Sequence, residues 1–288
     1  MPFTKNRLKI TKLTLSLVIL FYFNADSLAQ ESNWAAWEVE ADTLMNRQNY
    51  EGAIKLYSKI VNESKLKSKE NYRPLYKRAI ANYSTQNLES SLKDISQFIP
   101  EFPQNYQAHI LRALIYQQMG DADNQLIDLN QAIELQSGNL ELMRWRGSLL
   151  MEKGEYKQAK QDLLLARQQQ DDPELETNLG LAYYSLEEPD SALISLNKSI
   201  ELDATYEPAY LYAGSFCLEL EKFELGLKYL NLALLINTEN VNALFYKGVA
   251  LVELKKTDEG CSCLSKAFKA GQDDAADYLK QHCYDIYK

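Results

Sequence analysis

The sequence contains few of the residues that interrupt helices, with 11 glycines and 7 prolines among 288 residues. This scarcity excludes collagen-like and low-complexity classes and disfavours a chain of many short strands joined by turns. Histidine occurs twice, and no metal motif, phosphate-binding loop or nucleophile elbow is present. His109 occupies a position where a histidine at the edge of a core is expected. We therefore predict a non-catalytic protein with no metal and no cofactor.

Long apolar runs are also scarce. The longest spans residues 13–23, follows the basic stretch from Lys5 to Lys12, and is followed by Ser27 and Ala29 at positions −3 and −1 of a cleavage site before Gln30. This layout is typical of a secretory signal peptide. The alternative is a membrane anchor, but eleven residues at about 1.5 Å each are too short for a bilayer core of about 30 Å. We predict that residues 1–29 are removed and that the mature chain, without a transmembrane segment, is periplasmic or secreted.

Positive charge is in deficit, because 31 Lys and Arg stand against 40 Asp and Glu, a formal net charge of −9. Nucleic-acid phosphates and anionic lipid surfaces attract clustered Lys and Arg, so both are disfavoured as partners. The acidic residues are spread at helical spacing, which is typical of solvent-exposed helix faces that keep a protein soluble.

The sequence does contain an internal repeat of 34 residues, which is the length expected of a stacked array. Each copy has the pattern of two amphipathic helices, with small residues where the helices must touch and a large residue beside them. The pattern is clearest in two successive copies: Tyr210, Gly214, Gly226, Leu230 and Ala233 recur as Leu244, Gly248, Gly260, Leu264 and Ala267.

The same frame extends back over most of the chain. Counting from the start of each unit, position 8 is always small, position 20 is small in most units, and position 24 is large. The first unit is about four residues longer than the others, with the excess in residues 62–71, where a longer loop or an extended second helix is expected. Pro189 falls near the start of a second helix, where proline is tolerated. The seven units are 34–71, 72–105, 106–139, 140–172, 173–206, 207–240 and 241–274, and a capping helix is expected at 275–287.

This pattern resembles the tetratricopeptide repeat. The segments Asn49-Tyr50-Glu51-Gly52-Ala53 and Glu155-Tyr156-Lys157-Gln158-Ala159 are similar to the family's consensus. The resemblance covers nearly all of the mature chain. It implies an all-α, right-handed superhelical solenoid of helix-turn-helix repeats over residues 30–288, with a C-terminal capping helix.

In that family, positions 2, 5, 6, 9, 12 and 13 of the first helices line a concave groove. The resemblance therefore implies a groove rich in aromatic side chains that binds a segment of another protein, since such side chains are frequent binding anchors. The alternative is that some of them only pack between neighbouring first helices. The family's clamp for a C-terminal carboxylate is incomplete, because its Lys, Arg and Asn are scattered over separate units. The candidate groove residues are Tyr76, Lys77, Tyr83, Arg144, Trp145, Asn178, Tyr184, Tyr212, Phe245 and Tyr246.

The four cysteines separate into a core residue and a terminal group. Cys217 occupies a core position and is expected to be buried and free. Exported bacterial proteins of this family often carry cysteines that resemble Cys261 and Cys283, and the resemblance implies a disulfide between them that ties the capping helix to the last repeat. A Cys263–Cys283 pair or free thiols remain open. A zinc site built from the terminal cysteines and His282 does not have a known zinc spacing.

These features and the resemblance together predict a protein-binding scaffold or adaptor of the bacterial cell envelope. One alternative is an accessory subunit of an envelope enzyme or secretion complex that docks through its convex face. Another is a module that binds glycan or peptidoglycan on its tyrosines.

Overall fold

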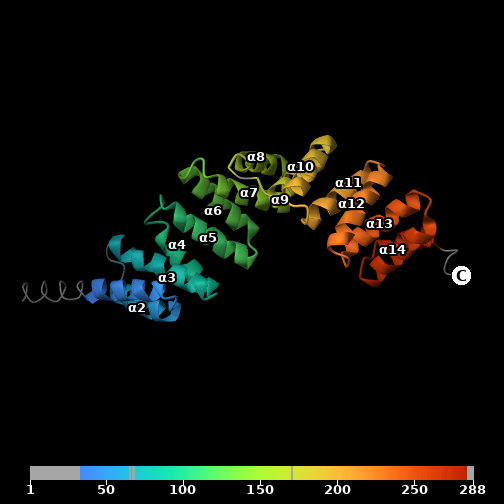
Figure 1. Cartoon of the computed structure of the whole chain (residues 1–288). Coiled ribbons are helices and arrows are strands. Elements are labelled where there is room, and N and C mark those ends of the chain that lie inside the picture. Colours follow the sequence, from blue (N-terminus) through green and yellow to red (C-terminus); the bar gives the residue numbers. More distant parts are fainter. Residues whose placement is uncertain (1–32, 65, 67–68, 170, 284–288) are drawn as a thin grey trace, which may run out of the picture. The chain divides into compact units, whose positions relative to one another are not determined.

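The computed structural model describes residues 33–64, 66, 69–169 and 171–283, and all regular structure in these ranges is helical (Figure 1). The predicted signal peptide, residues 1–29, lies outside the described residues. Among the described helices, none has both the length and the apolar character required to cross a bilayer.

The chain divides into two compact units, Met1–Ser137 and Gly138–Lys288, which we describe separately. In the first unit, residues 33–46 are helical and precede five α-helices and one short 3₁₀ helix. These elements are α2 (Tyr50–Ser64), η1 (Lys69–Tyr72), α3 (Arg73–Ser84), α4 (Leu88–Phe98), α5 (Tyr106–Met119) and α6 (Ala122–Leu135).

The second unit contains four helix pairs and a shorter final helix (Figure 1). The pairs are α7 (Leu140–Glu152) with α8 (Tyr156–Ala166), α9 (Pro173–Ser185) with α10 (Pro189–Leu202), α11 (Glu207–Glu219) with α12 (Phe223–Ile236), and α13 (Val241–Glu253) with α14 (Thr257–Lys269). The final helix, α15 (Ala275–His282), begins where the capping helix was expected. It ends earlier than residue 287, and residues 284–287 lie outside the described part.

Close helix pairing depends on the small residues of the repeat, as their spacing predicted. A Cβ atom built on Gly214 would lie 2.6 Å from Cγ of Leu230 on the paired helix, and one on Gly248 would lie 2.7 Å from Cγ of Leu264. No real Cβ tolerates such a distance, so the absence of a side chain at position 8 lets the leucine at position 24 fill the contact. The predicted complementarity of these two positions is confirmed.

The turn inside each repeat has one recurring backbone feature. Its residue at position 15 adopts a positive φ, and this residue is a glycine at Gly120 and Gly154 but carries a side chain elsewhere. A left-handed residue directly after a helix lets the next backbone N–H groups bond to the free carbonyls at the helix end. The side-chain-bearing residues at this position are Gln48, Gln86, Glu187, Glu221 and Lys255, with φ between 57° and 62°.

The repeat is irregular at two places, the longer first unit and Pro189. The longer first unit has an α2 of 15 residues, which agrees with an extended second helix, and the short helix η1 follows it before α3. Pro189 is the first residue of α10, where its missing N–H removes no helical hydrogen bond.

Candidate functional site

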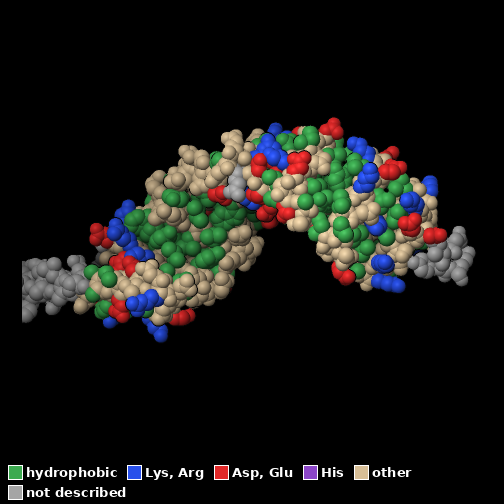
Figure 2. Space-filling view, viewed as in Figure 1, with side chains coloured by type: hydrophobic (Ala, Val, Ile, Leu, Met, Phe, Trp, Pro, Cys, Tyr) green, Lys and Arg blue, Asp and Glu red, His purple; other side chains and the backbone are tan. Residues whose placement is uncertain are grey.

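In the first unit, the predicted groove residues lie on α3 and already contact other parts of the unit. The Tyr76 ring stacks on Phe98 with centroids 5.0 Å apart. The Tyr83 hydroxyl accepts a hydrogen bond of 2.9 Å from Gln118. Figure 2 shows hydrophobic side chains gathered over the region of α3 to α6. Tyr76 is thus an extension of the core, and Tyr83 is half-buried and packs against the same core cluster.

Lys77 is held by the preceding repeat. Its ammonium group lies 2.7 Å from carboxylate oxygens of both Glu38 and Asp42. Burial lowers the pKa of Lys77, but the hydrogen bonds to Asp42 and Glu38 outweigh it, so the pKa lies above its ordinary value. Lys77 therefore joins two repeats and is not free to bind a partner's carboxylate.

In the second unit, α7 and α9 carry the next candidates. Arg144 pairs with Asp172 at 2.5 Å and with Glu174 at 3.3 Å, which ties α7 to α9. Trp145, next to it on α7, is half-buried. Asn178 lines a cavity of about 410 Å³ between these helices. Arg144 is thus already paired, whereas Asn178 faces open space.

Tyr184 and Tyr212 meet around Phe216 of α11. The Tyr184 ring stacks on Phe216 with centroids 3.7 Å apart, and its hydroxyl donates to Glu219. Burial raises the pKa of Tyr184, and the hydrogen bond to Glu219 and its charge raise it further. The Tyr212 ring is tilted against Phe216 at 6.2 Å. Tyr184 consequently packs between neighbouring first helices, as the alternative to groove binding described, and Tyr212 is less constrained.

Phe245 and Tyr246 line a cavity of about 450 Å³ formed by α11, α13 and α15. Tyr278 of α15 completes its aromatic wall, with its ring centroid 5.8 Å from that of Phe245 in an edge-to-face arrangement. Burial raises the pKa of Tyr246, and so do the negative charges of nearby Glu219 and Asp274. The cavity therefore has walls of aromatic rings and carboxylates.

The sequence reasoning missed the acidic part of this wall. Glu219 and Glu253 both line the cavity, and each stands at position 13 of its repeat, a groove position in the family's frame. Glu152, at the same position of an earlier repeat, lines the smaller cavity beside Asn178. The repeat frame places these acids on the groove face, but no acidic residue was included among the candidates.

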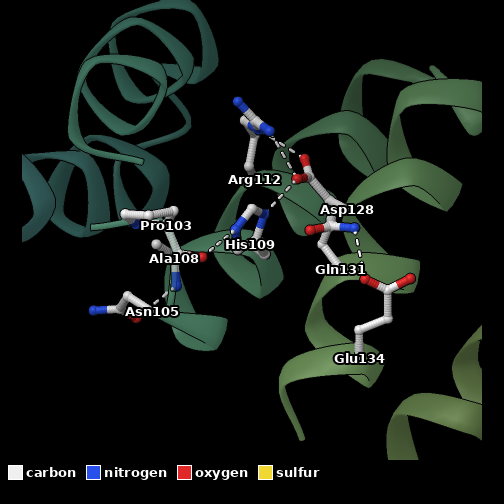
Figure 3. A network of polar contacts seen from close by, with 8 residues as sticks. All are labelled: Pro103, Asn105, Ala108, His109, Arg112, Asp128, Gln131 and Glu134. Carbon is white, nitrogen blue, oxygen red and sulfur yellow. Dashed lines mark hydrogen bonds and ion pairs between the residues drawn. The ribbon is translucent and has the colours of Figure 1, made fainter. Parts of the chain in front are cut away.

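A second group of charges was misread as solvent-exposed. Asp128 is 1% exposed and accepts hydrogen bonds from Arg112 Nε and Nη2, at 2.7 and 2.8 Å, and faces His109 Nδ1 at 2.9 Å (Figure 3). His109 is 4% exposed, as expected of a core histidine, and its Nε2 lies 3.3 Å from the Pro103 carbonyl oxygen. Burial raises the pKa of Asp128, but the bonds from His109 and Arg112 outweigh this and hold the pKa below its ordinary value.

The same pair occurs in the adjacent repeats, with Arg78 on Asp94 and Arg146 on Asp162, each with an Nε–oxygen distance of 2.7 Å. The prediction that acidic residues lie on solvent faces is wrong for these three aspartates. The sequence pattern that could have predicted these pairs is an arginine at position 7 and an aspartate at position 23 in three successive units.

The cysteines are arranged as the family resemblance implied. Cys261 and Cys283 form a disulfide with Cα atoms 5.7 Å apart, joining α14 to the residue after α15. Cys217 is buried and Cys263 is partly exposed, both as free thiols whose pKa is raised by burial. Within the described ranges, no three His, Cys, Asp or Glu side chains are placed to hold a metal ion.

Comparisons with known proteins agree with this fold. The family model described as "Tetratricopeptide repeat" matches residues 106–139 and 177–206. No curated protein matches the chain. A solved structure of the C-terminal part of a TPR repeat-containing protein from Cytophaga hutchinsonii is 19% identical, covers 84% of this chain and 99% of its own, and has a TM-score of 0.64.

Two further structures are similar. PilF of Pseudomonas aeruginosa is 19% identical over 74% of this chain and 99% of its own, with a TM-score of 0.58. YrrB, described as a TPR protein with an unusual peptide-binding site, is 21% identical over 65% of this chain and 97% of its own, with a TM-score of 0.53. The chain thus contains tetratricopeptide repeats at residues 106–139 and 177–206 and has the all-α repeat fold of that class of protein. Proteins of this class are generally non-catalytic scaffolds that bind other proteins or peptides.

Proposed function

We propose that this protein is a non-catalytic scaffold of the bacterial cell envelope that binds a segment of another protein against its first helices. The observation that carries the proposal is the aromatic cavity of about 450 Å³ between α11, α13 and α15. A concave site with aromatic walls and a few polar groups is the usual form of a binding site for a small molecule or a peptide side chain. The description of the similar YrrB as a peptide-binding protein supports a peptide as the ligand.

The contacts of the candidate residues assign them different roles. Tyr76, Lys77, Arg144 and Tyr184 each have a stacking or ion-pair partner within the chain and hold the binding surface in shape. The second group is half-buried and presents aromatic surface that is neither stacked face to face nor held by an ion pair, since Tyr212 and Tyr246 are only tilted against a neighbouring ring. Its members, the proposed anchors, are Trp145, Tyr212 and Tyr246.

The test is a crosslinked pull-down from intact cells that compares the wild type with Trp145→Ala/Tyr212→Ala. A matched control removes apolar surface from the outer helices through Ile194→Ala/Leu235→Ala, since these side chains are 69% and 77% exposed. A partner that is lost with the first variant and kept with the second supports binding on the first helices. The reverse pattern refutes it.

The reverse pattern would support a second candidate, an accessory subunit that docks through its outer face. One observation favours this candidate: the second helix α12 exposes Leu225, Leu232 and Leu235, at 39%, 43% and 77%. Several exposed apolar side chains on one helix are a common feature of interaction surfaces.

The envelope location rests on the sequence of residues 1–29. It is tested by fractionating cells and determining the N-terminus of the accumulated protein. A chain that begins at Gln30 and is released with the periplasm or the medium is the expected result. A cytoplasmic chain that retains residues 1–29 would refute the location and leave the binding proposal in place.

A further inference from the structure

The cavity formed by the sixth and seventh repeats and α15 is lined by both aromatic rings and carboxylates. Phe223, Phe245, Tyr246 and Tyr278 supply aromatic rings from α12, α13 and α15. Aromatic faces carry partial negative charge and attract cations placed within about 6 Å of the ring centre. The cavity thus offers both apolar surface and a favourable position for a cation.

Three carboxylates line the same cavity. Glu219 and Glu253 are the last residues of α11 and α13, and Glu221 follows in the turn before α12. Each helix C-terminus also carries partial negative charge, which adds to the attraction for a cation. Burial raises the pKa of the neighbouring Tyr246, and the charges of Glu219 and Asp274 raise it further.

Within the described part of the chain, the cavity lining supplies no base to neutralise these groups. Among the described residues that line the cavity, none is Lys, Arg or His. The Glu219 side chain accepts a hydrogen bond from Tyr184, whereas the side chains of Glu221 and Glu253 have neither a hydrogen bond nor an ion pair within the described part of the chain. Like charges that share one cavity repel each other, and an incoming cation relieves that repulsion.

We propose that this cavity binds a lysine or arginine side chain of the partner's segment, and so selects basic segments. This inference rests on the proposed function and specifies the chemistry of its ligand. An aliphatic stem packs on the aromatic wall while the charged head reaches the carboxylates, an arrangement that suits long basic side chains. The volume of about 450 Å³ has room for such a side chain with the flanking residues of its segment.

The test uses the mature full-length protein and a displayed library of random twelve-residue peptides. Peptides selected by the wild type should be enriched in Lys and Arg. The enrichment should disappear with Glu221→Gln/Glu253→Gln, and it should persist with Glu201→Gln/Glu239→Gln. The latter pair removes the same charge from exposed positions that do not line the cavity.

One selected peptide is then remade with citrulline in place of its enriched arginine, which removes the charge and keeps the shape. Binding to the wild type should weaken at least about tenfold, and the Glu221→Gln/Glu253→Gln variant should bind both peptides equally. Equal binding by the wild type would overturn the inference.

The outcomes separate the two proposals. Peptides that are selected without basic enrichment, and that are lost with Trp145→Ala/Tyr212→Ala, refute the cation site and leave the scaffold function standing. If no peptide is selected at all, both are refuted for peptide ligands. Thermal melting of each variant, unchanged from the wild type, shows that a loss of binding is not a loss of folding.

Discussion

Replacing Asp128 with asparagine should lower the free energy of unfolding of the first unit by about 3 kcal/mol. The carboxylate is 1% exposed and holds Arg112 through two hydrogen bonds as well as His109 through a third. Breaking a buried ion pair by removing one partner costs about 3–5 kcal/mol. The lower end applies because Arg112 is 21% exposed and can turn partly to water, while asparagine keeps one acceptor.

The loss should also depend on pH. The pKa of Asp128 in the folded state lies below its ordinary value, so its contribution is complete above the unfolded-state pKa of about 3.9. It disappears as the pH falls through the folded-state pKa. The difference between wild type and Asp128→Asn should therefore be largest near pH 7 and shrink below about pH 4.

The assay is urea unfolding followed by tryptophan fluorescence in a Trp145→Phe background. The remaining Trp34 and Trp37 both lie in the first unit and report on that unit alone. A difference below about 1 kcal/mol, or one that is constant from pH 7 to pH 3, would refute the reasoning.

Asp94→Asn is the matched control, because Arg78 holds Asp94 with the same two-nitrogen geometry but no histidine joins the pair. Arg78 also donates to the Ser58 hydroxyl at 3.0 Å and so keeps a partner after the substitution. The cost of Asp94→Asn should therefore be smaller than that of Asp128→Asn.

Three further predictions concern the second unit. Cys283→Ser should lower the free energy of unfolding by about 3 kcal/mol, because the disulfide to Cys261 closes a loop with a sequence separation of 22. Thiol titration of the denatured, unreduced wild type should find two thiols. Glu176→Met should raise the free energy of unfolding by about 1 kcal/mol, measured by thermal or urea unfolding. The reason is that this fully buried carboxylate makes no hydrogen bond, while its ion-pair partners, Arg167 and Lys198, stay partly in water. A loss of stability would contradict this. Gly214→Ala should cost about 1–3 kcal/mol through collision with Leu230, and the cost should largely vanish when it is combined with Leu230→Ala; additive effects would contradict that cause.

The helix pairing could be predicted from the sequence because it depends on residue size at fixed spacing. Gly214 and Leu230 belong to different helices, yet their contact follows from the repeat frame alone. The identity of the turn residues follows less directly. A positive φ at Glu221 or Lys255 is imposed by the helix pairing around it and overrides the residue's own preference.

The site could be predicted only in part, because a repeat frame assigns a residue to a helix face but not to a partner. Tyr184 lies on the expected face, yet its ring is stacked on Phe216 and its hydroxyl is bound to Glu219. Lys77 and Arg144 likewise lie where the frame places them. Lys77 is neutralised by acids of the preceding repeat, and Arg144 by Asp172 at the end of its own repeat and Glu174 of the next. These pairings join side chains about one repeat length apart, and no local pattern encodes them.

The distribution of paired and unpaired acids explains why charge recognition should belong to the C-terminal repeats. In the second to fourth repeats the buried aspartates at position 23 each have their own arginine at position 7, as Asp128 has Arg112. Such carboxylates stabilise the fold and have no charge to offer a partner. In the sixth and seventh repeats the acids stand at position 13, at the ends of α11 and α13, where the lining contains no base. Only acids that face a cavity without an internal counter-ion can select a basic ligand.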